Sequence, residues 1–415
     1  MNVLFLTQVL PYPLVGGAKI RAYYMLRQLA QNHQVTLVSF VRDDDRPADI
    51  AHLEQFCTAV HTVPIIRSRW RDGRSLLTSL ISGQPVVIIR DEIKEMQALL
   101  TRLVHQTPFD VVHADQTSMA QYGLYVKASG RVPYALLDQH NAMFKLVERQ
   151  ARQERTIWQR LIWQREARLL RQYETDLLPQ FDAILTVTEA DRERLLALLP
   201  AAQRPEIAAR TTAIPICVAP EQQPPLPWPA DKPQIIHLGT MFWPPNIEGV
   251  LWFAQEILPH VVAEVPQAHF VIAGKNPPPA ITALAESGFA YHQHIEVTGF
   301  VPNPDPLLSQ SRVFVVPLRA GGGMRVKVVD AWQWGIPIVA TSIGAEGIET
   351  VPGENILLAD EPEAFAAAVV ALLRDDILAQ QLRENGRLWV ETHYNWRTIY
   401  PQIETIYQNM VGPLG

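Results

Sequence analysis

The alternation of short apolar runs with amphipathic segments constrains this chain most strongly. Runs rich in β-branched residues, bounded by polar turns, recur along the whole sequence, and segments with helical period lie between them. The clearest runs in the first half are NVLFLT at 2, QVTLVSF at 34, DVVHA at 110, YALLD at 134 and DAILTV at 182. Because strands that are apolar throughout need cover on both faces, the pattern predicts an α/β fold with parallel sheets between helices.

A proline-rich stretch divides this pattern into two. Residues 219–233 contain six prolines and no periodic apolar face, which predicts a stiff extended linker. We therefore expect one doubly wound, Rossmann-like domain over 1–218 and a second over 234–394, with a C-terminal helix over 395–415. The carboxyl ends of the strands in such sheets bind ligands, so a cleft between two facing domains is the expected site.

Composition excludes several classes of protein. With 36 basic and 42 acidic side chains the net charge is −6, which does not suit a nucleic-acid partner. The two cysteines, Cys57 and Cys217, are too few for a disulfide framework, and we expect both to be buried in a reducing cytoplasm. The opening MNVLFLTQVL lacks the features of a signal peptide, and no apolar run approaches the roughly 18 residues of a membrane span. We expect a cytoplasmic protein, at most peripheral to a membrane.

A glycine-rich loop in the second half has the chemistry of a phosphate site. The segment VFVVPLRAGGGMRVKVVDAWQWGIPIVAT reads as strand, loop, helix from near Met324, stop at Gly335, and strand. Glycines let the backbone approach an anion, and the N–H groups and dipole of the helix point at the same place. Lys327 adds a charged donor, and Asp330 lies on the same helical face, suited to accepting from sugar hydroxyls. The alternative is a surface ion pair between Lys327 and Asp330. The candidate anion-binding residues are Gly321, Gly322, Gly323, Met324, Arg325 and Lys327.

Two common nucleotide-binding patterns are absent from the sequence. Neither predicted domain has G-x-G-x-x-G after its first strand, and GGGMRVKV does not match G-x-x-x-x-G-K-[ST]. A dinucleotide-dependent dehydrogenase and a P-loop NTPase are therefore disfavoured.

The run from His237 to Thr341 resembles the donor-binding domain of the retaining family 4 glycosyltransferases, which have the two-domain GT-B fold. The likeness rests on HLGTMFWPPNIEGVLWF, VIAGKNPP, VTGFV, the glycine-rich segment and GAEG, in this order. In the first half, Gly16 and Gly17 resemble the family's N-terminal glycine loop, and TVTEADRERL resembles its strand-to-helix step.

The resemblance implies transfer of a sugar from a nucleotide sugar, with UDP as the expected nucleotide, retention at the anomeric carbon and no metal or other cofactor. Lys327, Arg325 and loop amides would hold the diphosphate and stabilise its developing charge. Asp330 matches the second glutamate of the family's Glu-x7-Glu pattern, which binds the ribose. Gly322 replaces the first glutamate, as in a branch of similar enzymes with a GGG-x-R-x-K loop.

Further candidates follow from strand ends and from the same likeness. His140, after the strand YALLD, matches a histidine placed against the donor sugar; alternatively it is structural, with Asn141 as a helix cap. His113 and Asp115 lie at another strand end. Asn246 is either the cap of the helix that it opens or a donor or acceptor contact, and the two roles can coexist. The remaining expected donor contacts are backbone groups at Phe300 and Val301, which would read the nucleobase, and the loop carboxylate of Glu346.

Two charged segments need separate interpretations. We expect one helix over 143–178, with eight Lys and Arg against three Glu as far as residue 171, and with Trp158 and Trp163 between the charges. It is either a contact for an anionic membrane and a lipid-linked acceptor or a solvated surface. The acidic run over 43–45 imitates a D-x-D metal site, but beside two arginines at a turn it is expected to be a solvated charge run.

The sequence thus predicts a metal-independent, retaining GT-B glycosyltransferase whose first domain binds a glycan or lipid-linked acceptor for polysaccharide or glycolipid assembly. It would work in the cytoplasm, at the inner face of the plasma membrane, without nucleic-acid partners. The alternatives are a nucleotide-sugar epimerase of the same architecture and a non-catalytic protein that binds nucleotide sugars or glycans.

Overall fold

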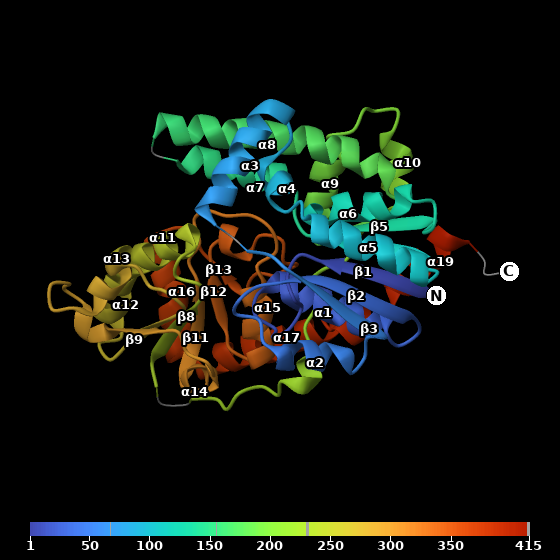
Figure 1. Cartoon of the computed structure of the whole chain (residues 1–415). Coiled ribbons are helices and arrows are strands. Elements are labelled where there is room, and N and C mark those ends of the chain that lie inside the picture. Colours follow the sequence, from blue (N-terminus) through green and yellow to red (C-terminus); the bar gives the residue numbers. More distant parts are fainter. Residues whose placement is uncertain (67, 155, 230–231, 413–415) are drawn as a thin grey trace. The chain divides into compact units, whose positions relative to one another are not determined.

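A computed structural model describes residues 1–66, 68–154, 156–229 and 232–412. The chain forms two compact units, one of Met1–Cys217 with Trp396–Gly415 and one of Val218–Asn395 (Figure 1). Three predicted elements include positions outside the described residues. These positions are 230 and 231 in the linker, 155 in the helix predicted over 143–178, and 413–415 in the C-terminal helix.

The first unit is built on a seven-stranded parallel sheet of order β3-β2-β1-β4-β5-β6-β7. The strands are β1 (Asn2–Thr7), β2 (Gln34–Val41), β3 (Ala59–Pro64), β4 (Val111–Asp115), β5 (Tyr134–Gln139), β6 (Ala183–Thr186) and β7 (Thr211–Ala213). The central strands β1, β4 and β5 are almost completely buried, as expected for a sheet covered on both faces. Because these three strands are neighbours, their carboxyl ends meet at one edge.

Helices follow most strands of this unit. They are α1 (Gly17–Leu29), α2 (Pro47–Glu54), α3 (Arg69–Ser82), α4 (Val86–Arg90), α5 (Lys94–Gln106), α6 (Thr117–Ala128), α7 (Met143–Gln153), α8 (Ile157–Leu177), α9 (Glu189–Leu196), α10 (Arg204–Ala209), α18 (Trp396–Ile399) and α19 (Gln402–Val411). The last two return the chain to this unit, where Trp396 stacks on Tyr24 with ring centroids 5.5 Å apart.

The prediction of one helix over 143–178 is wrong, because the structure has two, α7 and α8, which pack against each other. Asn141 is not the cap of α7, whose N-cap is Ala142. The carboxylate of Glu174 on α8 instead accepts the N–H groups of Met143 and Phe144, at 2.9 and 3.0 Å. A side chain from the second helix therefore satisfies the first turn of the first helix.

The second unit is built on a six-stranded parallel sheet of order β10-β9-β8-β11-β12-β13. The strands are β8 (Gln234–Leu238), β9 (His269–Ala273), β10 (Ile295–Gly299), β11 (Ser311–Val316), β12 (Ile338–Ala340) and β13 (Leu357–Leu358). Its α-helices are α11 (Pro244–Trp252), α12 (Leu258–Glu264), α13 (Pro279–Thr282), α14 (Asp305–Leu308), α15 (Val326–Trp334), α16 (Pro362–Arg374) and α17 (Asp376–His393).

Two helix starts differ from the sequence-based expectation. Helix α15 begins at Val326, two residues after the expected start at Met324, and ends as expected at Gly335, which has a left-handed φ of 69°. Helix α11 begins at Pro244 with Trp243 as its N-cap, so Asn246 is its third residue and the prediction of Asn246 as a cap is wrong. In the described residues, no helix is both long and apolar enough to cross a bilayer.

Candidate functional site

The glycine-rich loop between β11 and α15 is shaped by glycine and by one arginine. Gly321 and Gly323 have φ of 128° and 76°, positive values that residues other than glycine rarely adopt. A Cβ at Gly321 would lie 2.8 Å from Arg325 Nη2. The Arg325 guanidinium folds back on the loop, donating to the Gly322 carbonyl at 2.7 Å and to the Ile343 carbonyl at 3.2 Å. In this structure Arg325 therefore holds the loop in shape.

Lys327, in the first turn of α15, reaches the carboxyl end of β8. Its Nζ donates to Asn246 Oδ1 at 2.9 Å and lies 3.5 Å from His237 Nε2. His237 Nδ1 lies 2.9 Å from the Val315 carbonyl oxygen, and because a carbonyl only accepts, Nδ1 carries the proton and Nε2 offers its lone pair to Lys327. Two side chains thus orient the ammonium group.

His237 and Gly239 belong to this cluster although sequence reasoning did not select them. A Cβ at Gly239 would lie 2.9 Å from both Lys327 Nζ and Asn246 Nδ2, so a larger residue here would force these two side chains to shift. The available signal was the HLGT motif at the end of the second unit's first strand, where a doubly wound sheet binds its ligands.

The charges of this cluster are strongly affected by burial. Burial, together with the nearby Arg325, lowers the pKa of Lys327 to about 7, although Asp330 opposes the fall. Burial raises the pKa of Asp330 to about 7, although Lys327 opposes the rise. The pKa of His237 lies well below its usual value because of burial and of Lys327. An incoming anion would favour the ammonium form of Lys327, so the cluster is suited to binding negative charge.

The other predicted donor contacts of the second unit have separate positions. Glu346 lies after β12, with its carboxylate 3.6 Å from Arg325 Nη2. Asn246 Nδ2 also donates to the Thr240 carbonyl at 2.9 Å, which fixes the amide that receives Lys327. Phe300 and Val301 follow β10, with the Phe300 ring exposed.

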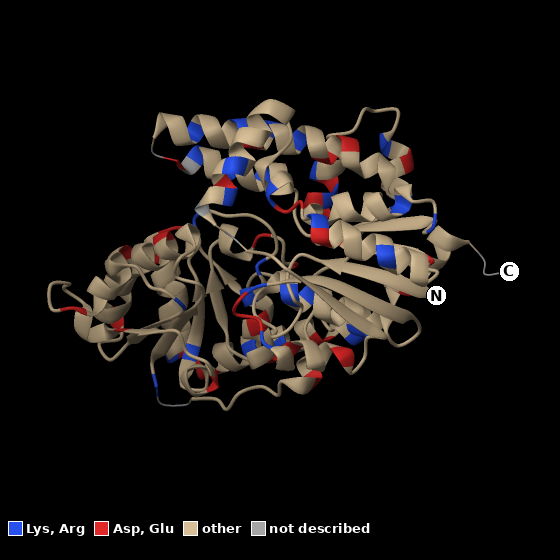
Figure 2. Cartoon of the chain, viewed as in Figure 1, with Lys and Arg blue, Asp and Glu red and all other residues tan. Residues whose placement is uncertain are grey.

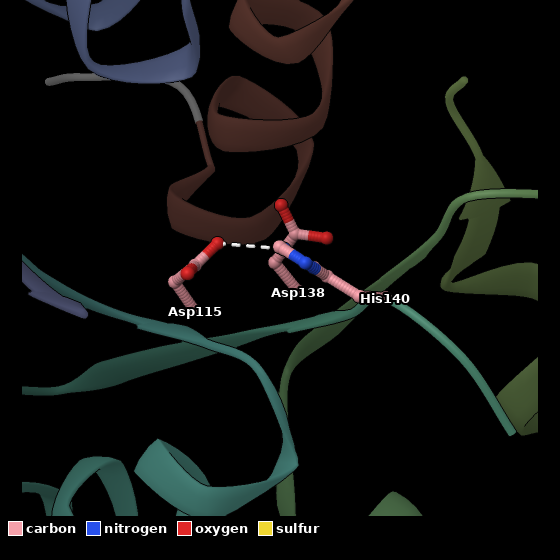
Figure 3. Close-up of side chains that lie close together, drawn as sticks. All are labelled: Asp115, Asp138 and His140. Carbon is pink, nitrogen blue, oxygen red and sulfur yellow. Dashed lines mark hydrogen bonds and ion pairs between the residues drawn. The ribbon is translucent and has the colours of Figure 1, made fainter. Parts of the chain in front are cut away.

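In the first unit, the structure brings His140 together with Asp115 at the edge formed by β4 and β5. His140 Nε2 lies 2.8 Å from Asp115 Oδ1, and both side chains are buried (Figure 3). Because the ionised Asp115 carboxylate can only accept, His140 carries its proton on Nε2 and has a lone pair on Nδ1. Gly16, with φ of 87°, is the N-cap of α1, and Gly17 is its first residue.

A buried ion pair joins α1 to β5 near this edge. The Arg21 guanidinium contacts both oxygens of Asp138, with distances of 2.8–2.9 Å, and both side chains are completely buried. Burial raises the pKa of Asp138, but Arg21 and the nearby histidines outweigh it and hold that pKa well below its usual range. His113 lies 3.7 Å from Asp138 and 2.8 Å from the Tyr407 hydroxyl on α19, so it serves the packing of the C-terminal helix.

Asp115, Asp138 and His140 are candidate metal ligands by distance, because one possible ligand atom from each lies within 4.8 Å of the others (Figure 3). The partners fit a metal poorly. Both oxygens of Asp138 already bind a guanidinium, whose positive charge opposes a cation, and His140 Nε2 faces Asp115.

In the run over 43–45, Asp45 accepts from the Arg42 N–H and pairs with Lys19 at 3.5 Å.

A small cavity of about 60 Å³ lies beside His140. It is lined by Gln8, Val87, Gln116, Thr117, Ser118, His140, Asn141 and Met143. Gln8, Gln116 and His140 follow β1, β4 and β5, so the cavity lies at the carboxyl edge of the central strands, where ligands of doubly wound sheets bind.

Comparison with family models identifies the chain. The model described as Glycosyltransferase Family 4 matches residues 15–222, just over half of the 415 residues. The chain belongs to glycosyltransferase family 4. A second family model, Glycosyl transferases group 1, matches residues 232–375 of this family 4 glycosyltransferase. These residues contain the glycine-rich loop and Lys327.

Individual proteins agree with this assignment. An uncharacterized 44.6 kDa protein in the cps region of Klebsiella pneumoniae is 21% identical over 95% of this chain and 96% of its own length. The structure of HepE from Anabaena in complex with UDP and glucose has a TM-score of 0.66 at 14% identity, covering 99% of this chain and 100% of HepE. Sucrose-phosphate synthase from Thermosynechococcus elongatus has a TM-score of 0.70 at 18% identity, covering 99% of each chain.

These findings confirm the predicted family and the GT-B fold of two doubly wound domains. They also identify the chain as a glycosyltransferase. The roles assigned to individual site residues stay predictions.

Proposed function

We propose that this glycosyltransferase transfers a sugar, with retention and without a metal, from a UDP-sugar to a glycan or lipid-linked acceptor. The observation that carries the proposal is Lys327, held by Asn246 and His237 at the N-terminus of α15 beside the glycine-rich loop. The structure of HepE with UDP and glucose supports uridine as the base.

In the proposed mechanism, the second unit binds the donor diphosphate. The Lys327 ammonium and the positive N-terminal end of the α15 dipole neutralise the charge that develops as the sugar–phosphate bond breaks. Asp330 accepts from ribose hydroxyls, and Arg325 holds the glycine-rich loop in its shape through the Gly322 and Ile343 carbonyls. Gly322 offers no carboxylate to the donor sugar.

The first experiment is a calorimetric titration with UDP, GDP and TDP, each with and without EDTA. We expect UDP to bind most tightly and with the same affinity in EDTA, because the positive charge comes from protein groups. Loss of UDP binding in EDTA would contradict metal independence. Binding of none of the three nucleotides would favour the non-catalytic alternative. In a separate incubation with a UDP-sugar and no acceptor, an isomerised sugar donor would favour an epimerase.

The affinity for UDP is expected to fall as the pH rises above about 7. In the protein without bound UDP, Lys327 has a pKa of about 7, so above this pH most molecules carry a neutral amine. These molecules must take up a proton at Lys327 before an ammonium can face the diphosphate. Kd should rise up to about tenfold per pH unit until the pKa of the bound state is reached. Calorimetry at pH 7, 8 and 9 in two buffers measures both affinity and proton uptake; an affinity independent of pH would contradict the assignment.

His140 is proposed to bind a sugar hydroxyl through Nδ1, with Asp115 as a positioning residue. In Asp115→Asn, the amide can donate to Nε2, which moves the imidazole proton to Nδ1 and removes the acceptor. We expect kcat to fall about tenfold or more, the effect of one lost oriented hydrogen bond, with UDP affinity unchanged.

His140→Ala combined with Asp115→Asn provides the control for that prediction. If Asp115 acts through His140, the double variant should lose no more activity than His140→Ala alone. Additive losses would mean that Asp115 has a separate role.

The proposal also includes a cytoplasmic location at the inner face of the plasma membrane and a role in polysaccharide or glycolipid assembly. Fractionation of cells that produce the protein tests the location. Product analysis by mass spectrometry with candidate glycan and lipid-linked acceptors tests the acceptor.

A further inference from the structure

Exposed apolar side chains are concentrated on two helices of the first unit. In the described residues, 19 large apolar side chains are exposed, and 11 of them lie on α8 or on α3 and the residue Ile66 shortly before it. They are Ile66, Trp70, Leu76, Leu77, Leu80, Ile81, Ile157, Trp158, Leu161, Ile162 and Trp163. Single exposed apolar residues are ordinary, but such a concentration marks an interaction surface.

Helix α3 has its apolar side reversed relative to a helix that packs on a core. Ser75 and Ser79, one turn apart, are buried, whereas Leu76 and Leu80 are exposed and Ile81 is 89% exposed. In a helix that only covers a soluble protein, the apolar stripe faces inward. The outward stripe of α3 is therefore suited to contact a partner outside the unit.

Helices α3 and α8 are linked through one arginine side chain. Arg165 of α8 donates to Ser79 Oγ at 2.9 Å and to the Ser79 carbonyl at 2.7 Å, which ties the two helices together, and Figure 1 shows them next to each other. On α8, Ala167 and Leu170 are buried, while Trp158, 75% exposed, faces solvent. The 11 residues above are called the α3–α8 surface.

The exposed charges around this surface are mainly basic. Arg74, Arg152 and Arg160 are exposed, and Lys and Arg positions recur along α7 and α8 in Figure 2. Between residues 157 and 168 of α8 the single acidic residue is Glu166, which is buried, with a carboxylate oxygen 3.4 Å from the Val87 backbone nitrogen. The outward residues of this part of α8 are therefore apolar, basic or amide side chains.

We propose that the α3–α8 surface docks on an anionic lipid bilayer. Tryptophan and aliphatic side chains would enter the headgroup region, and the arginines would contact lipid phosphates. A second copy of the chain fits less well, because a symmetric contact would bring arginines of equal charge together. The proposal rests on the membrane location proposed above and does not depend on which donor the enzyme uses.

Sedimentation of the full chain with vesicles tests the apolar part of the surface. We expect binding to vesicles that contain phosphatidylglycerol, and at least about tenfold weaker binding to phosphatidylcholine vesicles. The triple variant Trp70→Ser, Ile81→Ser and Trp158→Ser should lose at least tenfold in vesicle affinity. The matched control is Ile377→Ser with Leu388→Ser, two exposed apolar residues of the second unit, which should bind as the parent does.

The charge contribution is tested by Arg74→Glu with Arg160→Glu. Each arginine near an anionic surface contributes about fivefold in affinity, so the variant should lose the preference for phosphatidylglycerol, and Arg131→Glu, an exposed arginine elsewhere in the unit, should not. The far-ultraviolet circular dichroism spectrum and the midpoint of urea unfolding, measured in parallel, should stay unchanged in every variant, which shows that the first unit is folded in each one.

Three results would overturn the proposal. They are no sedimentation with either vesicle, equal affinity for both vesicles, or a dimer by light scattering that the triple variant dissociates. Failure of UDP binding in the parent protein would instead count against the proposed donor site, so the two proposals fail separately.

Discussion

Replacing Lys327 with alanine is expected to reduce sugar transfer by about 10²–10³-fold or more, the usual effect of removing one preorganised donor to a developing negative charge. The loss should appear mainly in kcat, because the charge on the diphosphate grows as the bond to the sugar breaks. Asn246 and His237 hold Nζ in place in the absence of ligand, so the group needs little reorganisation before reaction. Initial rates with a saturating acceptor measure the effect.

Two variants show whether position or charge matters at Lys327. Lys275→Ala removes an exposed lysine from the loop after β9 and should leave the rate unchanged. Lys327→Arg keeps the charge, but a planar guanidinium has another shape than the compact ammonium close to Gly239 and Asn246, so it should not restore activity. A normal rate in Lys327→Ala would overturn the assignment of the phosphate site.

The alternation of strands and helices was sufficient to predict the fold, because apolar runs and turn residues are local signals. The errors occur where a distant side chain decides a local structure. The chain breaks between α7 and α8, although the charge pattern continues through 143–178, and Glu174 caps α7 from the other helix. Asn246 has the residue type of a cap, but the rigid turn starts the helix earlier and leaves its amide for Lys327.

The candidate site was partly predictable for the same reason. Lys327, Asp330 and the glycines share one short segment, so their spacing was readable in the sequence. His237 lies 90 residues from Lys327, and the pair depends on the adjacency of β8 and β11, which only the folded sheet provides. The exposed stripe of α3 was also missed, because burial of serines under exposed leucines opposes the usual inward placement of apolar residues.

The substitution Arg21→Met is expected to destabilise the first unit by about 3–5 kcal/mol, because it leaves the carboxylate of Asp138 buried without its ion partner. Arg21 also donates to the carbonyls of Ile214 and Pro215, at 2.6 and 3.2 Å, so the same change releases the end of this unit's sheet. Urea unfolding followed by tryptophan fluorescence measures the free energy of unfolding. Arg131→Met, at an exposed arginine, should change it by less than about 0.5 kcal/mol.

The double variant Arg21→Met with Asp138→Leu separates the ion pair from simple packing. Removing both charges should recover much of the stability that Arg21→Met loses, because no uncompensated charge then remains buried. The pH dependence provides a second check. The folded-state pKa of Asp138 is depressed, so its contribution to stability is present above the carboxyl pKa of the unfolded chain, near 4, and is lost as the pH falls towards the folded value. Arg21→Met should weaken this loss on acidification, and an acid unfolding profile parallel to that of the parent would show that Arg21 is not what keeps Asp138 ionised.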